Sequence, residues 1–181
     1  MLVADRGFTT EPGQFQVLPG VPAALARLQR AGFALVVVSN QAVVARGLLT
    51  EAALKDLERE LEQCLMALGA PALDGFYSCP HHPAATLPEY RLDCPCRKPR
   101  PGLLLQAARD LGLDLAASFM VGDRPTDLQA GQAAGCRSVW VQTGRHLDPP
   151  IETPEASGPA AMPVLVCADL AAAAAWILGE G

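Results

Sequence analysis

The sequence is poor in several residue types, and each shortage narrows what the protein can be. Among 181 residues it contains two lysines, two isoleucines and one asparagine, a bias that suggests a GC-rich genome. It has no basic run, and its net charge of -5 with a pI near 5.1 argues against nucleic acid as a partner. Its apolar stretches fall short of a membrane span, and Asp5 and Arg6 stand too early for a signal peptide. We therefore expect a cytoplasmic protein, monomeric and without a membrane partner.

What is present suits one compact domain over residues 1–181, because 50% of the residues are hydrophobic and can form a sizeable core. Where a chain nearly excludes a residue type, the few that remain deserve a chemical explanation. The only asparagine is Asn40, in "VVVSNQ", and one of the two lysines is Lys98, in "CRKPRPG".

Apolar periodicity alternates between helix and strand along most of the chain, which predicts an α/β fold of Rossmann-like type. We expect a mainly parallel sheet with helices on both faces and ligands at the carboxyl ends of the strands. The run "FALVVVS" is continuous and not alternating, so it is expected to be a strand buried on both faces. A Pro-rich surface stretch is expected over 145–163. Expected helices cover 20–31, 50–69, 101–112, 124–135 and the end of 163–179; expected strands cover 33–39, 73–79, 118–123, 137–144 and the start of 163–179.

Polar side chains suited to binding a phosphate group stand at or near the ends of three of these segments. Ser39 and Asn40 end a strand, Lys98 stands just before a helix, and Asp123 and Asp127 follow the strand "FMVG". A hydroxyl, a fixed ammonium and acidic metal ligands are what a Mg²⁺-dependent phosphoryl-transfer site needs. Taken singly, Ser39 and the aspartates could equally cap helices.

A second group of residues lies in a loop over 80–100 that has no apolar period of its own. The pattern "CPHH" followed by "CPC" offers Cys79, His81, His82, Cys94 and Cys96. Three thiols and an imidazole match a closed tetrahedral zinc site that would hold the loop (79–96), although free surface thiols are the alternative. The remaining cysteines are expected to be small core residues: Cys64, Cys136 and Cys167.

The segments "FALVVVSNQAVVARG", "CPHHP…CPCRKPRPG" and "FMVGDRPTDLQAG" resemble the haloacid dehalogenase (HAD) superfamily. Within it they are similar to the D-glycero-D-manno-heptose 1,7-bisphosphate 7-phosphatases and to the histidinol-phosphate phosphatase domain, over about residues 2–144. The resemblance implies a phosphosugar phosphatase with Mg²⁺, a structural Zn²⁺ and no large cap domain. It implies that Ser39 and Lys98 hold the phosphoryl group, that Asp123 ligates Mg²⁺ and that Asp127 supports it.

The resemblance also implies a substrate side and a zinc set. Substrate candidates are Asp5, Arg6, Gly7, Phe8, Asn40, Gln41, Ala42, Arg46 and Arg97. Arg97 suits a second, remote phosphate through its planar fork. The family's Cys-x-His pattern selects Cys79, His81, Cys94 and Cys96 as zinc ligands. Ala42 and Val43 stand where the family usually has Ser-Gly, which leaves the substrate contacts there open.

In the family, an Asp at the end of the first strand attacks phosphorus and an Asp two residues later acts as acid and base. Here the stretch from Asp5 to Phe8 matches a later loop, so the first strand and both catalytic aspartates are expected to lie upstream of Met1. The chain as it stands is then expected to be inactive, and to fold poorly or to recruit "MLVA" as a makeshift strand. In the rival interpretation "MLVA" is the first strand and Asp5 the nucleophile. Two other classes stay open: a non-catalytic phosphosugar-binding relative, and a zinc-dependent interaction module.

Overall fold

The computed structural model describes residues 1–4, 10–11, 13–143 and 163–179. The four loop candidates from Asp5 to Phe8 lie outside the described residues, and so does the Pro-rich stretch expected over 145–163, apart from its last residue.

Helices and strands alternate as the periodicity predicts. The helices are α1 (Val21–Arg30), α2 (Ala42–Ala45), α3 (Glu51–Ala67), α4 (Gly102–Leu111), α5 (Pro125–Ala134) and α6 (Leu170–Ile177), with a 3₁₀ turn η1 (Pro88–Tyr90). The strands are β1 (Val36–Asn40), β2 (Gly75–Cys79), β3 (Phe119–Gly122), β4 (Arg137–Val141) and β5 (Leu165–Cys167).

Local chemistry accounts for the helix ends. The Thr50 side chain accepts a hydrogen bond from the Ala53 backbone N–H at 3.1 Å and so caps α3, as its place before the first helical residue predicts. Gly112 ends α4 in the left-handed conformation, with φ of 66°. Asp169 caps α6 by accepting from Ala172.

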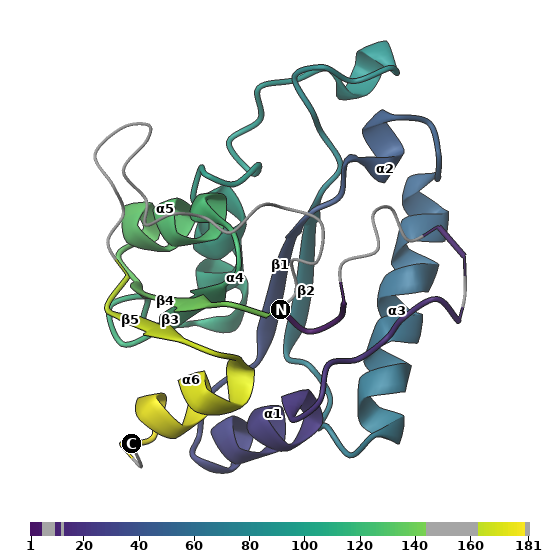
Figure 1. Cartoon of the computed structure of the whole chain (residues 1–181). Coiled ribbons are helices and arrows are strands. Elements are labelled where there is room, and N and C mark those ends of the chain that lie inside the picture. Colours follow the sequence, from purple (N-terminus) through teal and green to yellow (C-terminus); the bar gives the residue numbers. More distant parts are fainter. Residues whose placement is uncertain (5–9, 12, 144–162, 180–181) are drawn as a thin grey trace.

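The strands form two parallel half-sheets in place of one continuous sheet (Figure 1). β1 pairs with β2, and β3, β4 and β5 pair in that order. β1 and β3 each have a neighbour on one side only within the described part of the chain.

This division corrects the expectation that the strand beginning at 33 is buried on both faces. The five residues of β1 are all partly exposed, because a strand with one neighbour leaves part of its backbone and side chains uncovered. The first four residues do not fill the gap as a parallel strand. Val3 instead forms an antiparallel bridge to Val17, while Leu2 packs into the core.

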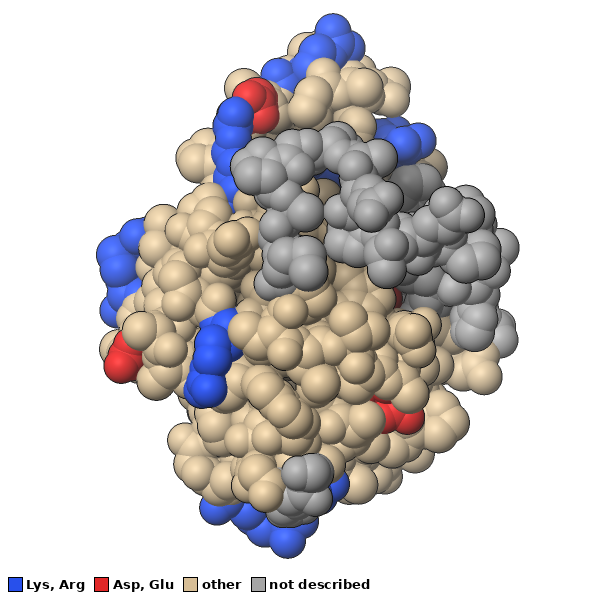
Figure 2. Space-filling view, turned by 60° about the vertical axis from the view of Figure 1, so that its left-hand side comes forward, with Lys and Arg blue, Asp and Glu red and all other residues tan. Residues whose placement is uncertain are grey.

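Helices pack on both faces of the half-sheets, as the fold class predicts. α4 and α5 pack against each other and against the strands, α4 on β1 and β2 and α5 on β3 and β4. The main core joins α1, α3 and α6 to β4 through side chains such as Leu28, Leu65 and Val139. No described helix has the length and apolar character to cross a bilayer. On the face drawn in Figure 2, Lys and Arg side chains are dispersed and do not merge into one basic surface.

Candidate active site and metal centre

A cavity of about 1180 Å³ lies between the two half-sheets and reaches the carboxyl ends of β1 and β3. Parallel strands present their carboxyl ends at one edge, so the residues that follow them converge there. The candidate residues that line this cavity are Ser39, Asn40, Gln41, Ala42, Arg46, Arg97, Lys98, Asp123 and Asp127. The structure thus brings together candidates from three separate motifs.

Lys98 and Asp127 form a buried ion pair at this edge. The Lys98 Nζ lies 2.7 Å from Asp127 Oδ1, and the two side chains are 10% and 7% exposed. The same ammonium donates to the Val38 carbonyl at 2.7 Å. Lys98 therefore connects β1 to the start of α5 across the cavity, and it presents a fixed positive charge beside Ser39.

The second oxygen of Asp127 has a different function. Asp127 Oδ2 accepts the Arg124 backbone N–H at 3.0 Å, which satisfies one of the first amides of α5. The close approach of Asp127 to β3 requires a glycine at 122, since a Cβ there would meet the Asp127 Cβ at 2.3 Å. Both oxygens of Asp127 thus have protein partners, which suits a supporting carboxylate better than a direct metal ligand.

Asp123 stands at the end of β3 with its carboxylate 15% exposed. Its Oδ2 pairs with the Met1 ammonium at 2.9 Å. Its carboxylate lines the cavity and offers hard oxygen atoms, the ligand type that Mg²⁺ prefers in sites where it keeps several waters.

Asn40 uses both atoms of its amide on the backbone of one residue. Its Nδ2 donates to the Lys98 carbonyl, and its Oδ1 accepts the Lys98 N–H, each at 3.0 Å. These two bonds attach the end of β1 to the chain 58 residues later. The neighbouring Gln41 donates through Nε2 to the Ser39 hydroxyl oxygen at 3.1 Å.

Arg97 is held by the loop that carries the cysteines. Its guanidinium donates to the His81 carbonyl at 2.9 Å, and burial lowers the pKa of the guanidinium from its ordinary value. Arg46 follows α2 and lines the same cavity, and Ala42 begins that short helix.

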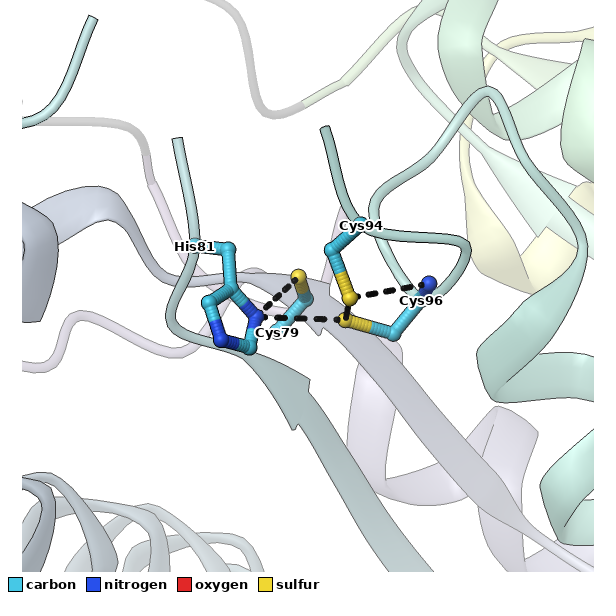
Figure 3. Close-up of side chains that lie close together, drawn as sticks. All are labelled: Cys79, His81, Cys94 and Cys96. Carbon is cyan, nitrogen blue, oxygen red and sulfur yellow. Dashed lines mark hydrogen bonds between the residues drawn. The ribbon is translucent and has the colours of Figure 1, made fainter. Parts of the chain in front are cut away.

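Four side chains of the 80–100 region and the end of β2 converge on one point (Figure 3). The ligand atoms of Cys79, His81, Cys94 and Cys96 all lie within 4.8 Å of one another. His81 Nδ1 is 3.7 Å from both the Cys79 and the Cys96 sulfur, close to the N···S edge of about 3.6 Å for a tetrahedron with a Zn–N bond of about 2.05 Å and Zn–S bonds of about 2.3 Å. The Cys94 and Cys96 sulfurs are closer, at 2.7 Å.

The environment of the thiols also fits a cation. Burial, followed by contact with the neighbouring thiols, raises the pKa of Cys96, and burial raises that of Cys79. Three neighbouring thiols hold thiolate charge together only when a positive ion compensates it. His82 is not among the four, and its Nδ1 accepts the Ala84 backbone N–H at 3.0 Å. The cluster can therefore hold a metal ion, in the set that the Cys-x-His pattern selects.

The structure leaves some sequence expectations unmet. Cys64, Cys136 and Cys167 are all only partly buried, and of the three Cys167 packs against the main core. The contacts of Asn40 to Lys98 and of Lys98 to Val38 were not anticipated, and no sequence signal points to them because the partners lie about 60 residues apart. The roles assigned to the individual site residues stay predictions.

Comparison with known proteins identifies relatives over most of the chain. Residues 95–173 match the family model described as HAD-hydrolase-like. The D-glycero-beta-D-manno-heptose-1,7-bisphosphate 7-phosphatase of Escherichia coli strain K12 is 44% identical over 149 residues, 82% of this chain and 78% of that protein. The enzyme of the same name from Yersinia pestis is 45% identical over 142 residues, 78% of this chain and 75% of that one. The crystal structure of D,D-heptose 1,7-bisphosphate phosphatase from B. bronchiseptica, complexed with magnesium and phosphate, is 34% identical with a TM-score of 0.78, covering 99% of this chain and 94% of that chain.

Proposed function

This chain belongs to the HAD-like hydrolases, in the family of the D-glycero-beta-D-manno-heptose-1,7-bisphosphate 7-phosphatases, and we propose that its site serves hydrolysis of the 7-phosphate of that sugar in the full-length form. One observation of the structure carries the proposal. The Lys98–Asp127 ion pair lies beside Ser39 and Asp123 at the carboxyl ends of β1 and β3, where a phosphoryl group can meet a fixed ammonium and a hydroxyl together.

In this proposal Ser39 and Lys98 bind the transferring phosphoryl group. The equatorial oxygens gain charge in the transition state, and a preorganised ammonium stabilises that charge without having to reorient. Arg97 and Arg46 line the same cavity and bind the sugar side, with Arg97 suited to the remote 1-phosphate. Asn40, Gln41, Ala42 and the loop from Asp5 to Phe8 complete the substrate side.

Asp123 would hold Mg²⁺, with Asp127 supporting it. When bound, the ion supplies positive charge to the phosphoryl oxygens. Asp127 keeps Lys98 in place. Asp123 would thus act on the phosphoryl group through the metal ion, and Asp127 through Lys98.

The covalent route requires a carboxylate oxygen that attacks phosphorus while the bond from phosphorus to the sugar oxygen breaks. The leaving oxygen takes a proton from a second carboxylic acid, and water then cleaves the aspartyl-phosphate. We propose that the 181 residues lack both carboxylates and bind the substrate without turning it over. In support, residues 1–4 belong to neither half-sheet, and Val3 forms an isolated antiparallel bridge to Val17.

The metal of the cysteine cluster is, in this proposal, a structural Zn²⁺. Its ligands Cys94 and Cys96 directly precede Arg97 and Lys98, and His81 contributes the carbonyl that binds Arg97. A closed tetrahedral site leaves no position for substrate, so the ion would fix the loop that positions two cations.

The proposal is tested with the 181-residue chain, Mg²⁺ and D-glycero-D-manno-heptose 1,7-bisphosphate. We expect calorimetry to show binding and a phosphate-release assay to show no turnover, with binding lost in Lys98→Met and kept in Lys55→Met. Binding of histidinol phosphate in preference to the heptose would favour the other branch of the family. Turnover that disappears in Asp5→Asn would establish Asp5 as the nucleophile, and absence of binding to either compound would overturn the proposed function.

Three broader properties complete the proposal: a cytoplasmic location, a monomeric state and one domain over residues 1–181. The acidic net charge and the scattered cations in Figure 2 argue against a nucleic-acid partner.

A further inference from the structure

His82 belongs to the cysteine loop but not to its metal cluster. The cluster uses the neighbouring His81, whereas His82 lines the cavity between the two half-sheets, as Ser39 and Lys98 do. A polar side chain in the wall of a substrate cavity is a candidate for binding that substrate. The proposed function leaves His82 without a role.

The backbone and the ring of His82 are both held by hydrogen bonds. Its N–H donates to the Tyr90 carbonyl and its carbonyl accepts the Ala85 N–H, each at 3.0 Å. The Ala84 N–H donates to its Nδ1, also at 3.0 Å. The ring therefore has a fixed orientation before a ligand enters, which reduces the entropy lost on binding.

The bond to Nδ1 determines which ring nitrogen can donate. A nitrogen that accepts a hydrogen bond carries no proton, so the neutral ring has its proton on Nε2. Burial, and then the positive charges of Arg97 and Arg46, lower the pKa of His82 from its ordinary value of 6.5, which favours that neutral form. Nε2 thus offers one N–H donor, on the side of the ring away from the Ala84 contact.

Arg97 is fixed to the same stretch of backbone. Its guanidinium donates at 2.9 Å to the carbonyl of His81, the residue directly before His82. Because the charge of Arg97 also acts on the pKa of His82, the guanidinium lies close to the imidazole. Both side chains line the cavity, so one anion there can contact them together.

Arg46 joins these two side chains from α2. The carbonyl of Ala45, the last residue of α2, accepts the N–H groups of Thr86 and Leu87 at 2.9 and 3.1 Å. The end of α2 is thereby attached to the cysteine loop. Arg46 follows directly, lines the cavity, and acts on the pKa of His82 as Arg97 does.

Two guanidiniums and one neutral N–H give this part of the cavity positive charge and hydrogen-bond donors. A phosphate dianion complements them, because its terminal oxygens accept several hydrogen bonds and its charge is balanced. The ammonium of Lys98 is held elsewhere, between β1 and α5. The cavity is thus lined by two separate sets of cationic donors, a number that matches a substrate with two phosphates.

We propose that His82 is a specificity-determining residue whose Nε2–H donates to the phosphate that the reaction does not transfer, beside Arg97 and Arg46. The inference rests on the proposed function and deepens it, because it names a side chain that distinguishes a bisphosphate from a monophosphate. The cysteine loop then positions a neutral donor as well as the two cations that follow its metal ligands.

Two substitutions separate the donor from a structural role of the ring. His82→Asn keeps an oxygen that can accept from Ala84 but ends short of the position of Nε2. His82→Gln reaches that position with an N–H donor. Calorimetry on the 181-residue chain with Mg²⁺ compares heptose 1,7-bisphosphate with heptose 7-phosphate, which lacks only the 1-phosphate.

We expect wild-type protein to prefer the bisphosphate, and the preference to fall about tenfold in His82→Asn, since a hydrogen bond to a charged group is lost. Affinity for the 7-phosphate should change less than twofold, and His82→Gln should keep most of the preference. Thr86→Ala truncates an exposed side chain of the same loop outside the cavity and should change neither affinity. The metal content of all variants should equal that of wild type.

A measurement on the unaltered chain keeps the test decisive if the variants fold poorly. With ¹⁵N-labelled histidine, the Nε2 resonance of His82 should shift on addition of the bisphosphate and not of the 7-phosphate. An unchanged resonance at saturating bisphosphate overturns the inference, and so does a variant His82→Asn that keeps the full preference. In both cases the sugar still binds, so the proposed function stands. Absence of binding to either sugar by wild-type protein overturns the proposed function and this inference with it.

Discussion

The Nζ of Lys98 lies 2.7 Å from Asp127 Oδ1 and 2.7 Å from the carbonyl oxygen of Val38, so one side chain joins β1 to the first turn of α5. Both partners of the ion pair are almost fully buried. A buried charge that loses its partner is left without water or a counter-ion, and this determines what mutation of the pair should do.

Lys98→Met is expected to lower the free energy of unfolding by about 3–5 kcal/mol, because it leaves the Asp127 carboxylate buried and unpaired. Urea denaturation measures the change, and Lys55→Met, at an exposed position of α3, is the matched control. The double variant Lys98→Met/Asp127→Leu should recover part of the loss. A double variant no more stable than Lys98→Met would contradict the ion-pair explanation.

Asn40→Ala is expected to weaken phosphate binding at least tenfold, because it removes both hydrogen bonds that hold the Lys98 backbone. Asn40→Asp is the close comparison: it keeps an acceptor for the Lys98 N–H but loses the donor to the carbonyl. Calorimetry with inorganic phosphate measures affinity, and the metal content should stay at the wild-type level. Unchanged phosphate affinity in Asn40→Ala would show that Lys98 is held in place by other contacts.

About one zinc per chain is expected in freshly purified protein, and its loss in both Cys94→Ser and Cys96→Ser. Cys64→Ser removes a thiol of α3 outside the cluster and should leave the metal content unchanged. Elemental analysis by mass spectrometry provides the measurement. Zinc-free wild-type protein, prepared without chelators, would contradict the assignment.

The stability of the fold should fall as pH rises just above 4.5, in part through Glu58. Burial raises the pKa of this carboxyl above its ordinary value of 4.5, although the Ser78 hydroxyl donates to it. Between the two pKa values the folded state binds more protons than the unfolded state, so stability falls with rising pH and levels off above the folded-state pKa.

Glu58→Gln removes this dependence while keeping an acceptor for Ser78. We expect the variant to be more stable than wild type at pH 7 and equal to it below pH 4, as measured by thermal denaturation at both values. Glu89→Gln, at an exposed position of η1, controls for the change in net charge. A variant less stable than wild type at pH 7 would show that the ionised carboxylate is favourable there.

The sequence predicts the bounds of α3 well but not the burial of β1. Thr50 and the apolar spacing after it predict α3 almost to the residue, since capping and periodicity are local properties. The burial of β1 was predicted wrongly, because exposure depends on how many strands lie beside it, which local sequence does not encode.

The candidate site divides in the same way. The cysteine spacing identifies the metal cluster, whose four ligands the structure brings together. The strand-end motifs identify residues that share one cavity, but not the pairing of Lys98 with Asp127 or the contact of Asn40 with Lys98. Those contacts arise where separate segments meet, so only the folded arrangement shows them.

Amine-reactive reagents encounter an unusual target in this chain, because it has only two lysines and one of them is buried in the pair with Asp127. The Lys98 side chain is only 10% exposed and contacts Asp127 and the Val38 carbonyl, so a reagent has little access to its amine. Lys55 is exposed on α3 and is the lysine that remains available. Among the lysine side chains a dye or cross-linker therefore attaches at one position, and the other amine that it can modify is the Met1 amino group, which is 26% exposed beside Asp123.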